Sequence, residues 1–334
     1  MTTSNLPLGG SALETVLAPR LEEVEERLAR AVTGADEMVD AASSHLAAAG
    51  GKRLRPVLTL LAAELGGGAN EEVLEAAVAV ELTHLATLYH DDVMDSAPLR
   101  RGAASAHELW GNSVAILTGD LLFARASQVV ARLGADAVRV HAETFERLCL
   151  GQLHESIGPR AGEDPLEHYI GVLADKTGSL IATSARYGAS FSGAGREVAG
   201  VLERFGAKVG VAFQLADDVI DLTSDAATTG KTPGTDLREG VDTMPVLLLR
   251  ARQANGTLDA AGRQVLADLS TDLQSDAALT RVVDALRAHE ALDEARALAT
   301  RWADDAVAEL APIPDGEVKD ALTAFAGMLV DRLA

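Results

Sequence analysis

Two short aspartate-rich segments carry the most distinctive chemistry in this sequence. The first is DDVMD at residues 91–95, and the second is DDVID at residues 217–221, far along the chain. Each follows an apolar stretch with helical spacing, and residues four apart lie on the same face of a helix. Asp91 with Asp95, and Asp217 with Asp221, are therefore each expected to present two carboxylates along one helix edge.

Clustered carboxylates repel one another, and burying them without a counter-charge costs several kcal/mol. Hard oxygen ligands offered in ones and twos, with room for water and phosphate oxygens, suit Mg²⁺ better than zinc or a softer metal. A solvated acidic face is the alternative interpretation of one such motif alone. Two copies, each behind an apolar run (residues 78–88 and 209–216), favour metal binding instead.

Basic residues gather near the acidic motifs, although the chain as a whole is acidic. GGKRLRP at residues 50–56 precedes an apolar helix, and cations at a helix start suit an anion such as diphosphate. RRG follows the first acidic motif at residues 100–102, KTG interrupts a helical pattern at 176–178, and Lys231 lies in a polar stretch. Each could be an ordinary solvated cation. Together they favour a ligand with several phosphates and several Mg²⁺ ions.

Helical periodicity positions these motifs and extends through almost the whole chain. The expected helices cover residues 13–31, 55–65, 71–90, 117–133, 137–156, 166–189, 197–219, 246–252 and 278–310, the last one divided. No alternating strand pattern stands out. The sequence predicts an all-α protein, with a disordered head at residues 1–12 and a single domain at 13–334. Residues 223–243 are a candidate active-site flap.

Composition excludes several classes of function. A net charge of −21 argues against binding a nucleic-acid backbone or a membrane surface through a basic face. The single cysteine, Cys149, permits no intrachain disulfide, fits a reducing cytoplasm, and is expected to be a small buried hydrophobe. The N-terminus lacks a signal-peptide pattern, and no uncharged apolar run is long enough to predict a transmembrane segment.

The order of these motifs resembles the trans-isoprenyl diphosphate synthases, also called polyprenyl synthetases. The resemblance extends from about Gly50 to Arg250. It is carried by GGKRLRP (50–56), ELTHLATLYHDDVMDSAPLRRG (81–102), GNSVAILTGDLLFARA (111–126), KTGSL (176–180), FQLADDVIDL (213–222) and GKTPGTDLREG (230–240). It implies a bundle of mostly antiparallel helices around a deep central cavity, the isoprenoid synthase fold, usually in a homodimer. It also implies Mg²⁺-dependent, head-to-tail condensation of isopentenyl diphosphate with an allylic diphosphate.

The resemblance also implies a role for individual residues. Asp91, Asp95 and Asp217 would ligate three Mg²⁺ ions that bridge the allylic diphosphate, and Asp92, Asp218 and Asp221 would support bound water. The isopentenyl diphosphate site would contain Lys52, Arg55, His84 and Arg101. Contacts around the allylic end would come from Arg100, Lys176, Thr177, Gln214 and Lys231. Thr177 and Gln214 would stabilise the carbocation as dipoles.

Small residues before the first acidic motif bear on product length. In the family, bulky aromatic residues just upstream of this motif close the cavity, whereas Ala86 and Thr87 stand there in this chain, with Thr83 one turn earlier. Phe145, on the opposite wall, is a candidate floor or ordinary core packing. We therefore expect a long-chain all-trans product of the kind used in quinone side chains. Geranylgeranyl or farnesyl diphosphate is the alternative.

Two other functions share parts of this pattern. A terpene cyclase would keep the helical fold and the first motif, but would usually replace the second motif and would lack GGKRLRP. A non-catalytic partner subunit should have lost aspartates, and all are present here. The enzyme interpretation is favoured over both.

Overall fold

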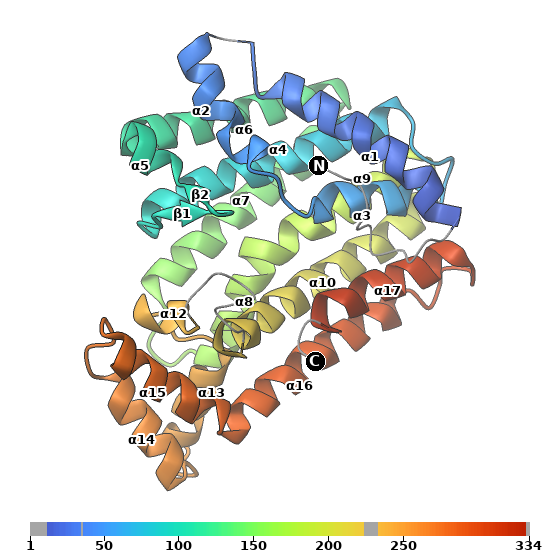
Figure 1. Ribbon diagram of the computed structural model, residues 1–334. Helices are drawn as coiled ribbons and strands as arrows, with labels where there is room; N and C mark the ends of the chain where they lie inside the picture. Colours follow the sequence, from blue (N-terminus) through green and yellow to red (C-terminus); the bar gives the residue numbers. More distant parts are fainter. Residues whose placement is uncertain (1–11, 35, 224–232, 332–334) are drawn as a thin grey trace. The chain divides into compact units, whose positions relative to one another are not determined.

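The computed structural model describes residues 12–34, 36–223 and 233–331. These residues form an almost entirely helical protein, as predicted (Figure 1). The helices are α1 (Ala12–Ala31), α2 (Glu37–Ala48), α3 (Leu54–Ala63), α4 (Glu71–Met94), α5 (Ala106–Trp110), α6 (Asn112–Arg132), α7 (Ala135–Ile157), α8 (Pro165–Leu173), a π-helix η1 (Ala174–Gly178), α9 (Ser179–Phe191), α10 (Arg196–Thr223), α12 (Thr235–Arg238), α13 (Met244–Ala254), α14 (Ala260–Leu269), α15 (Asp276–Arg287), α16 (Glu290–Glu309) and α17 (Glu317–Asp331).

The chain divides into two compact units. Unit 1 contains Met1–Glu146, Leu180–Gly206 and Glu309–Phe325, and unit 2 contains Arg147–Ser179, Ala207–Ala308 and Ala326–Ala334. That residues 13–334 form one domain stays a prediction. The expected disordered head lies outside the described residues except for Ala12, which begins α1.

Unit 1 is organised around α4. This helix packs mainly against α6, and also against α3 and α1 (Figure 1). The α3 helix is buried along nearly its whole length, from Pro56 to Ala63. Its neighbour α9 approaches so closely that a Cβ added at Gly188 would lie 2.1 Å from the carbonyl oxygen of Thr59. Only glycine permits this backbone contact, so α3 and α9 form a tight inner layer.

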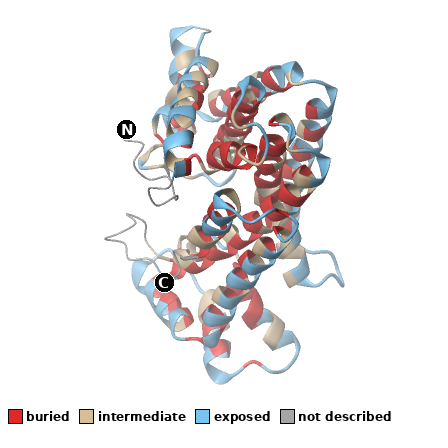
Figure 2. Cartoon of the chain, turned by 90° about the vertical axis from the view of Figure 1, so that its right-hand side faces the viewer, coloured by how far each residue is buried: buried red, intermediate tan, exposed pale blue. Residues whose placement is uncertain are grey.

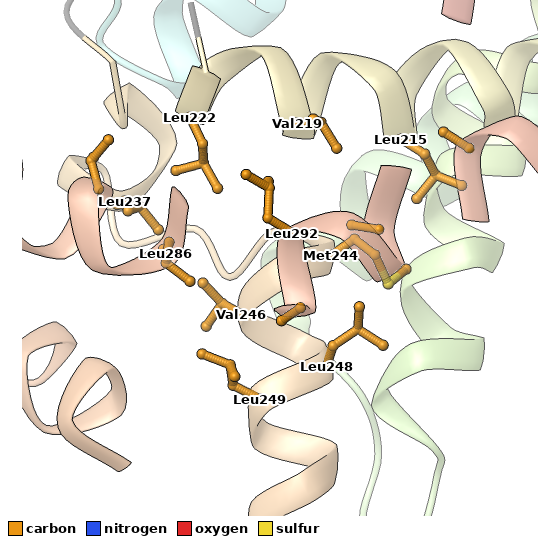
Figure 3. Close-up of a cluster of buried hydrophobic side chains, with 14 of the residues drawn as sticks. Leu215, Val219, Leu222, Leu237, Met244, Val246, Leu248, Leu249, Leu286 and Leu292 are labelled. Carbon is orange, nitrogen blue, oxygen red and sulfur yellow. The ribbon is translucent and has the colours of Figure 1, made fainter. Parts of the chain in front are cut away.

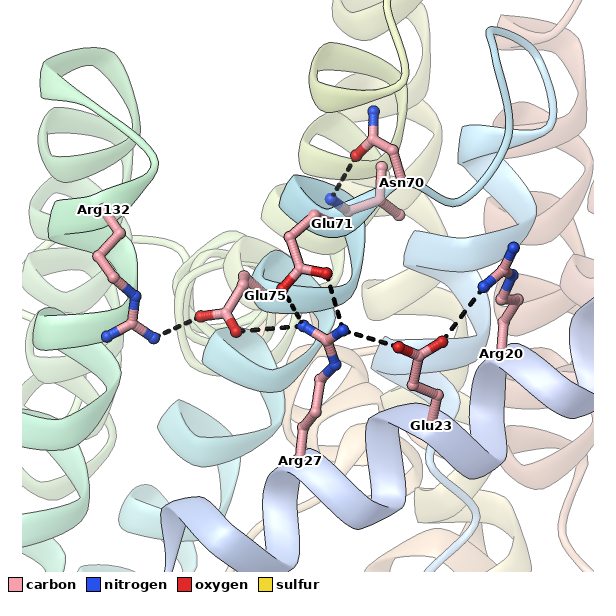
Figure 4. A network of polar contacts seen from close by, with 8 residues as sticks. Arg20, Glu23, Arg27, Asn70, Glu71, Glu75 and Arg132 are labelled. Carbon is pink, nitrogen blue, oxygen red and sulfur yellow. Dashed lines mark hydrogen bonds and ion pairs between the residues drawn. The ribbon is translucent and has the colours of Figure 1, made fainter.

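A polar network joins three helices at the edge of unit 1 (Figure 4). The guanidinium of Arg27, on α1, donates to Glu23 on its own helix and to Glu71 and Glu75 on α4. Arg132, at the end of α6, binds the other oxygen of Glu75. Because one guanidinium is shared by three carboxylates, this network fixes the position of α1 on α4 more than a single surface ion pair would.

Unit 2 has its own hydrophobic core. Figure 3 shows Leu215, Val219 and Leu222, one face of α10, directed at side chains from α13 and the helices that follow. Leu237, on α12, and Met244, at the start of α13, belong to the same core. Hydrogen-bonding caps begin several helices in both units, at Asp36 (α2), Asn70 (α4), Asp164 (α8), Asp259 (α14) and Ser275 (α15).

The sequence-based element map was incomplete. The helices that were not predicted are α2, α5, α12, α14 and α17. The expected helix at 166–189 is interrupted by the π-helix. The sequence showed no sign of the one short strand pair in the described residues, in which Leu99–Arg100 (β1) pairs antiparallel with Ala103–Ala104 (β2). Residues 224–232 of the expected flap lie outside the described residues, and the remainder contains the short helix α12.

The α6 helix is long and apolar enough to cross a membrane by length and composition alone, although it carries Asp120 and Arg125. Within its most apolar window 44% of the residues are buried in the protein. Its buried face, including Ala115, Leu122 and Ala126, packs in unit 1. Its other face, including Ile116 and Leu117, is exposed; Figure 2 shows how exposed and buried residues alternate around the helices. The observed packing of α6 is that of a helix in a folded bundle.

Candidate active site

The first acidic motif lies at the C-terminal end of α4. Asp92 is fully buried, and its Oδ1 accepts a hydrogen bond of 2.6 Å from Nε of Arg100. Its Oδ2 is buried without a hydrogen-bond partner among the described residues. Burial raises the pKa of Asp92, and the charge of Arg100 opposes that rise. Asp91 is half-buried and Asp95, the residue after the last turn, is exposed.

A small hairpin positions the two arginines that follow this motif. Strands β1 and β2 are joined by Arg101 and Gly102, which both have positive φ, at 55° and 78°. A two-residue turn with two positive φ angles is the type I′ hairpin, in which Asn-Gly is the usual pair. Arg100 pairs with Asp92. The guanidinium of Arg101 instead donates hydrogen bonds to backbone carbonyl oxygens within residues 46–51.

The contact between Arg101 and the GGKRLRP segment is close. Its Nη1 donates to the carbonyl oxygens of Leu46, at 2.9 Å, and of Gly50. A Cβ added at Gly51 would lie 2.9 Å from the guanidinium carbon. Glycine at position 51 therefore lets the guanidinium approach the backbone directly.

The same segment carries Lys52, Arg53 and Arg55 at the start of α3. Lys52 is exposed and Arg55 is half-buried. The buried Nε of Arg55 has no hydrogen-bond partner within the described part of the chain. Burial lowers the pKa of Arg55 to about 10, with partial relief from Glu81 and further lowering from Arg101. Arg55 is thus a desolvated cation whose charge is incompletely compensated.

His84, on α4, shares this cationic environment. Burial, and then the charges of Arg55, Arg101, Arg100 and Arg53, lower its pKa well below 6.5. Several guanidinium groups close to this half-buried neutral imidazole repel one another. An anion bound among them would relieve that repulsion, so this cluster of His84, Arg55 and Arg101 fits a phosphate-bearing ligand.

The second acidic motif lies near the C-terminal end of α10 in unit 2. Asp218 is buried, and its Oδ2 accepts hydrogen bonds from the hydroxyl of Tyr169, at 2.9 Å, and from the amide of Met244, at 3.2 Å. Burial raises the pKa of Asp218 well above 3.8 despite these two donors. Asp217 and Asp221 are half-buried. The middle carboxylate thus anchors the motif in the core and leaves its neighbours more accessible.

A π-helix presents the KTG residues. The i→i+5 pattern over Ala174–Gly178 interrupts the path from α8 to α9, and such π-bulges occur often at functional sites. Lys176 binds Glu155, and the hydroxyl of Thr177 donates to Oε1 of Gln214 at 3.3 Å. A Cβ added at Gly210 would lie 2.4 Å from Cα of Gly178, so two glycines hold the π-helix tightly against α10.

The carboxylates of each motif provide oxygen donors in pairs. No group of three His, Cys, Asp or Glu side chains converges on a metal site in the ranges that the structure describes. Mg²⁺ is commonly held by only one or two carboxylates together with substrate phosphates. The pairs Asp91 with Asp95, and Asp217 with Asp221, fit that mode of binding. The assignment of Asp91, Asp95 and Asp217 as Mg²⁺ ligands stays a prediction.

The structure places the product-length candidates on two helices of unit 1. Ala86 and Thr83 are fully buried in α4, and Thr87 is half-buried. Phe145, on α7, is 37% exposed, and its ring centroid lies 4.3 Å from that of Phe123 on α6. The two rings line a cavity of about 190 Å³. Phe145 is therefore a partly exposed residue of the α6–α7 surface, and its role as a floor is untested.

Sequence reasoning missed several residues and misjudged one. It assigned no role to Glu81 or Tyr169, whose partners Arg53 and Asp218 are distant in the sequence, and it gave Arg53 no separate role. The expectation that Cys149 is buried was wrong, because its side chain is exposed. Lys231 lies outside the described residues.

Comparisons with known proteins agree on one family. The model of the family described as polyprenyl synthetase matches residues 36–284. The nonaprenyl diphosphate synthase of Mycobacterium tuberculosis is 42% identical over 98% of this chain and 97% of its own length. Component 2 of the heptaprenyl diphosphate synthase of Geobacillus stearothermophilus is 37% identical, covering 93% and 95% respectively. A crystal structure of the geranylgeranyl pyrophosphate synthase of Corynebacterium glutamicum, complexed with calcium and isoprenyl diphosphate, superposes with a TM-score of 0.85, 42% identity, and coverage of 97% and 98%.

The depressed pKa of His84 predicts a specific dependence of stability on pH. The unfolded chain takes up a proton at this histidine near pH 6.5, whereas the folded chain stays neutral, so stability is lost as the pH falls below 6.5. Between about pH 7.5 and about pH 5.5, we expect the wild type to lose about 1 kcal/mol more unfolding free energy than His84→Asn. Urea denaturation at both pH values measures the difference, and parallel losses in the two proteins would contradict it.

Proposed function

Because this chain belongs to the polyprenyl synthetase family, we propose that it condenses isopentenyl diphosphate head-to-tail with an allylic diphosphate, forming a long-chain all-trans polyprenyl diphosphate. The observation that carries the proposal is the pairing of a carboxylate-rich helix end with a cluster of incompletely neutralised cations in unit 1. The first suits Mg²⁺ and the second suits diphosphate. The names of the relatives support the same class of reaction.

Isopentenyl diphosphate is assigned to the basic cluster of Lys52, Arg55, His84 and Arg101. Arg55 is desolvated, and its Nε has no hydrogen-bond partner among the described residues, so an incoming anion would stabilise it. The same anion would also reduce the repulsion among the arginines around the neutral His84. Arg101 is oriented by backbone carbonyls, so its position does not depend on the substrate. This prepared arrangement reduces the reorganisation needed at the moment of binding.

The allylic diphosphate is assigned to the two acidic motifs and the cations Arg100, Lys176 and Lys231. Asp91, Asp95 and Asp217 would hold Mg²⁺, which neutralises the charge that develops on the leaving diphosphate. The oxygen-only donor sets support this metal, and calcium accompanies the isoprenyl diphosphate in the Corynebacterium structure. Thr177 and Gln214 present dipoles that can stabilise an allylic cation.

Removal of a motif carboxylate should abolish most of the activity. We expect Asp91→Ala and Asp217→Ala each to lower the turnover number by orders of magnitude without loss of helicity, because charge neutralisation at the leaving group is lost. The measurement is incorporation of labelled isopentenyl diphosphate, with circular dichroism as a check on folding. Asp136→Ala, an exposed carboxylate in the first turn of α7, is the control. Turnover near that of the control would refute the metal assignment.

The length of the prenyl product is a separate part of the proposed function. Relatives of equal identity carry names with different products, nonaprenyl and geranylgeranyl diphosphate, so overall similarity does not decide it. The residues before the first motif support a long chain, since Ala86 and Thr87 add little volume to that part of α4. A wall of small side chains leaves space that an aromatic ring would fill.

Substitution of Ala86 tests this assignment. Ala86→Phe should shorten the product at a comparable initial rate, because a close-packed wall yields to an added ring only with strain of ~1–3 kcal/mol or more. Chromatography of the dephosphorylated alcohols gives the product length. Ala86 is fully buried, so Ala86→Leu serves as a milder variant and Ala86→Gly as a control. An unchanged product distribution in folded Ala86→Leu and Ala86→Phe would show that Ala86 does not border the growing chain.

We also propose a cytoplasmic homodimer. On α6, Ile116 and Leu117 are 42% and 64% exposed, and on the first half of α7 the exposed apolar residues include Val138 and Phe145. An apolar face of this kind marks an interaction surface, and a second copy of the chain is the proposed occupant. The Geobacillus relative is named as one component of a synthase, so an unlike partner is the competing possibility.

Placing a charge on this face tests the homodimer. Leu117→Glu should convert the dimer to a monomer in analytical ultracentrifugation, because a carboxylate would be buried without a partner in the interface. Met38→Glu, at an equally exposed apolar position on α2 (58%), is the control and should stay dimeric. A wild type that sediments as a monomer would refute the proposal and direct attention to an unlike partner.

A further inference from the structure

A buried ion pair lies beside the basic cluster of unit 1. Nη1 of Arg53 donates to Oε1 of Glu81 at 3.0 Å, and the two side chains are only 7% and 2% exposed. Arg53 stands directly before α3 with a φ of 50°, in the left-handed region that non-glycine residues rarely adopt. Glu81 lies on α4, one turn before His84. The sequence motifs gave neither Arg53 nor Glu81 a role in substrate binding.

The hydrogen bonds of Arg53 occupy its whole donor set. An arginine side chain has five N–H donors. Five hydrogen bonds leave this guanidinium, to both oxygens of Glu25, to Oε1 of Glu81, and to the carbonyl oxygens of Ala47 and Gly50. No donor is left over for a phosphate oxygen. Arg53 therefore differs from Arg55, whose buried Nε has no hydrogen-bond partner among the residues that the structure describes.

Glu81 could compete with a diphosphate for the arginines Arg55 and Arg101. Nη1 of Arg101 and Nη1 of Arg53 donate to the same carbonyl oxygen, that of Gly50, so Arg101 lies beside the ion pair. Burial lowers the pKa of both Arg55 and Arg101, and the negative charge of Glu81 opposes that lowering. A buried carboxylate that lost Arg53 would have to find another cation, because an unpaired buried charge costs several kcal/mol. Arg55 and Arg101 are the cations that this carboxylate already attracts. Either one, once bound to Glu81, would be withdrawn from a diphosphate.

We propose that Arg53 is a positioning residue that occupies Glu81 and thereby keeps Arg55 and Arg101 available for the diphosphate of isopentenyl diphosphate. The identity of the substrate in this inference rests on the proposed function. The competition between the Glu81 carboxylate and a diphosphate does not depend on it. Glu25 supports the arrangement, since it binds Nε and Nη2 of Arg53 from α1 and directs Nη1 to Glu81. Arg53 acts through its neighbours and does not touch the substrate.

The test compares a single variant that removes the charge of Arg53 with a double variant that also removes the charge of Glu81. Arg53→Met should raise the KM for isopentenyl diphosphate by about tenfold or more, because Glu81 then captures a substrate-binding arginine. The turnover number and the KM for the allylic substrate should change much less. Adding Glu81→Gln to Arg53→Met removes the competitor and should restore the KM for isopentenyl diphosphate to near the wild-type value. Arg186→Met, which breaks the Arg186–Glu203 ion pair elsewhere in unit 1, controls for loss of an Arg–Glu pair.

Two outcomes would overturn the proposal. If the double variant keeps the raised KM, Arg53 contacts the substrate itself. If Arg53→Met lowers the thermal midpoint and leaves both KM values unchanged, the ion pair is only structural. Should Arg53→Met fail to fold, Arg53→Gln replaces it, since glutamine is also neutral and leaves Glu81 without a counter-charge. The same rise in KM and its reversal by Glu81→Gln are then expected.

A binding measurement separates this proposal from the proposed function. Calorimetric titration of each variant with inorganic diphosphate needs no turnover. Loss of affinity in Arg53→Met and recovery in the double variant support the role of Arg53 even if isopentenyl diphosphate is not the substrate. Equal affinity of the wild type and Arg53→Met for inorganic diphosphate would refute the role of Arg53, whatever the enzyme proves to catalyse.

Discussion

The arrangement of charge around the C-terminal half of α4 depends on one constraint, namely that a buried ionisable group must have a partner or change its protonation. Glu81 meets it with Arg53, and Asp92 meets it in part with Arg100. His84 meets it by remaining neutral. The cations of Arg55 and Arg101 are the ones left with incomplete compensation, since burial lowers the pKa of each. A ligand-free cluster of this kind is unfavourable for folding and favourable for binding an anion.

In unit 2, the buried aspartate of the second motif is stabilised by neutral hydrogen-bond donors. Asp218 is held by the hydroxyl of Tyr169 and the amide of Met244 rather than by a cation. Burial raises the pKa of this carboxyl group, and the two neutral donors only partly oppose that rise. In both motifs the second aspartate is the buried one, and the first and last are more accessible. The same sequence pattern thus combines a buried internal anchor with two more accessible carboxylates in each unit.

The aspartates and most of the basic residues could be predicted from the sequence because their types, order and contrast with the apolar background are visible there. The pair formed by Arg53 and Glu81 could not, since a carboxylate within an apolar run gives no sign of its partner. The helix α2 was missed because EMVDAASSHLAA has a weak apolar pattern and depends on the Asp36 cap and packing. Exposure of Cys149 was missed for a related reason, because a sequence does not show which apolar helix faces lack cover.

In the described residues, the non-glycine residues with positive φ lie near the acidic and basic motifs of unit 1. The three non-glycine residues with positive φ among residues 12–34, 36–223 and 233–331 are Arg53, Ser96 and Arg101. Each such conformation costs on the order of 1 kcal/mol, and none improves the packing of an apolar core. Arg53 needs it to reach Glu81 from the start of α3, and Arg101 needs it to turn the hairpin toward Gly51. Two of these three residues therefore carry guanidinium groups, and each of those groups is held by several hydrogen bonds.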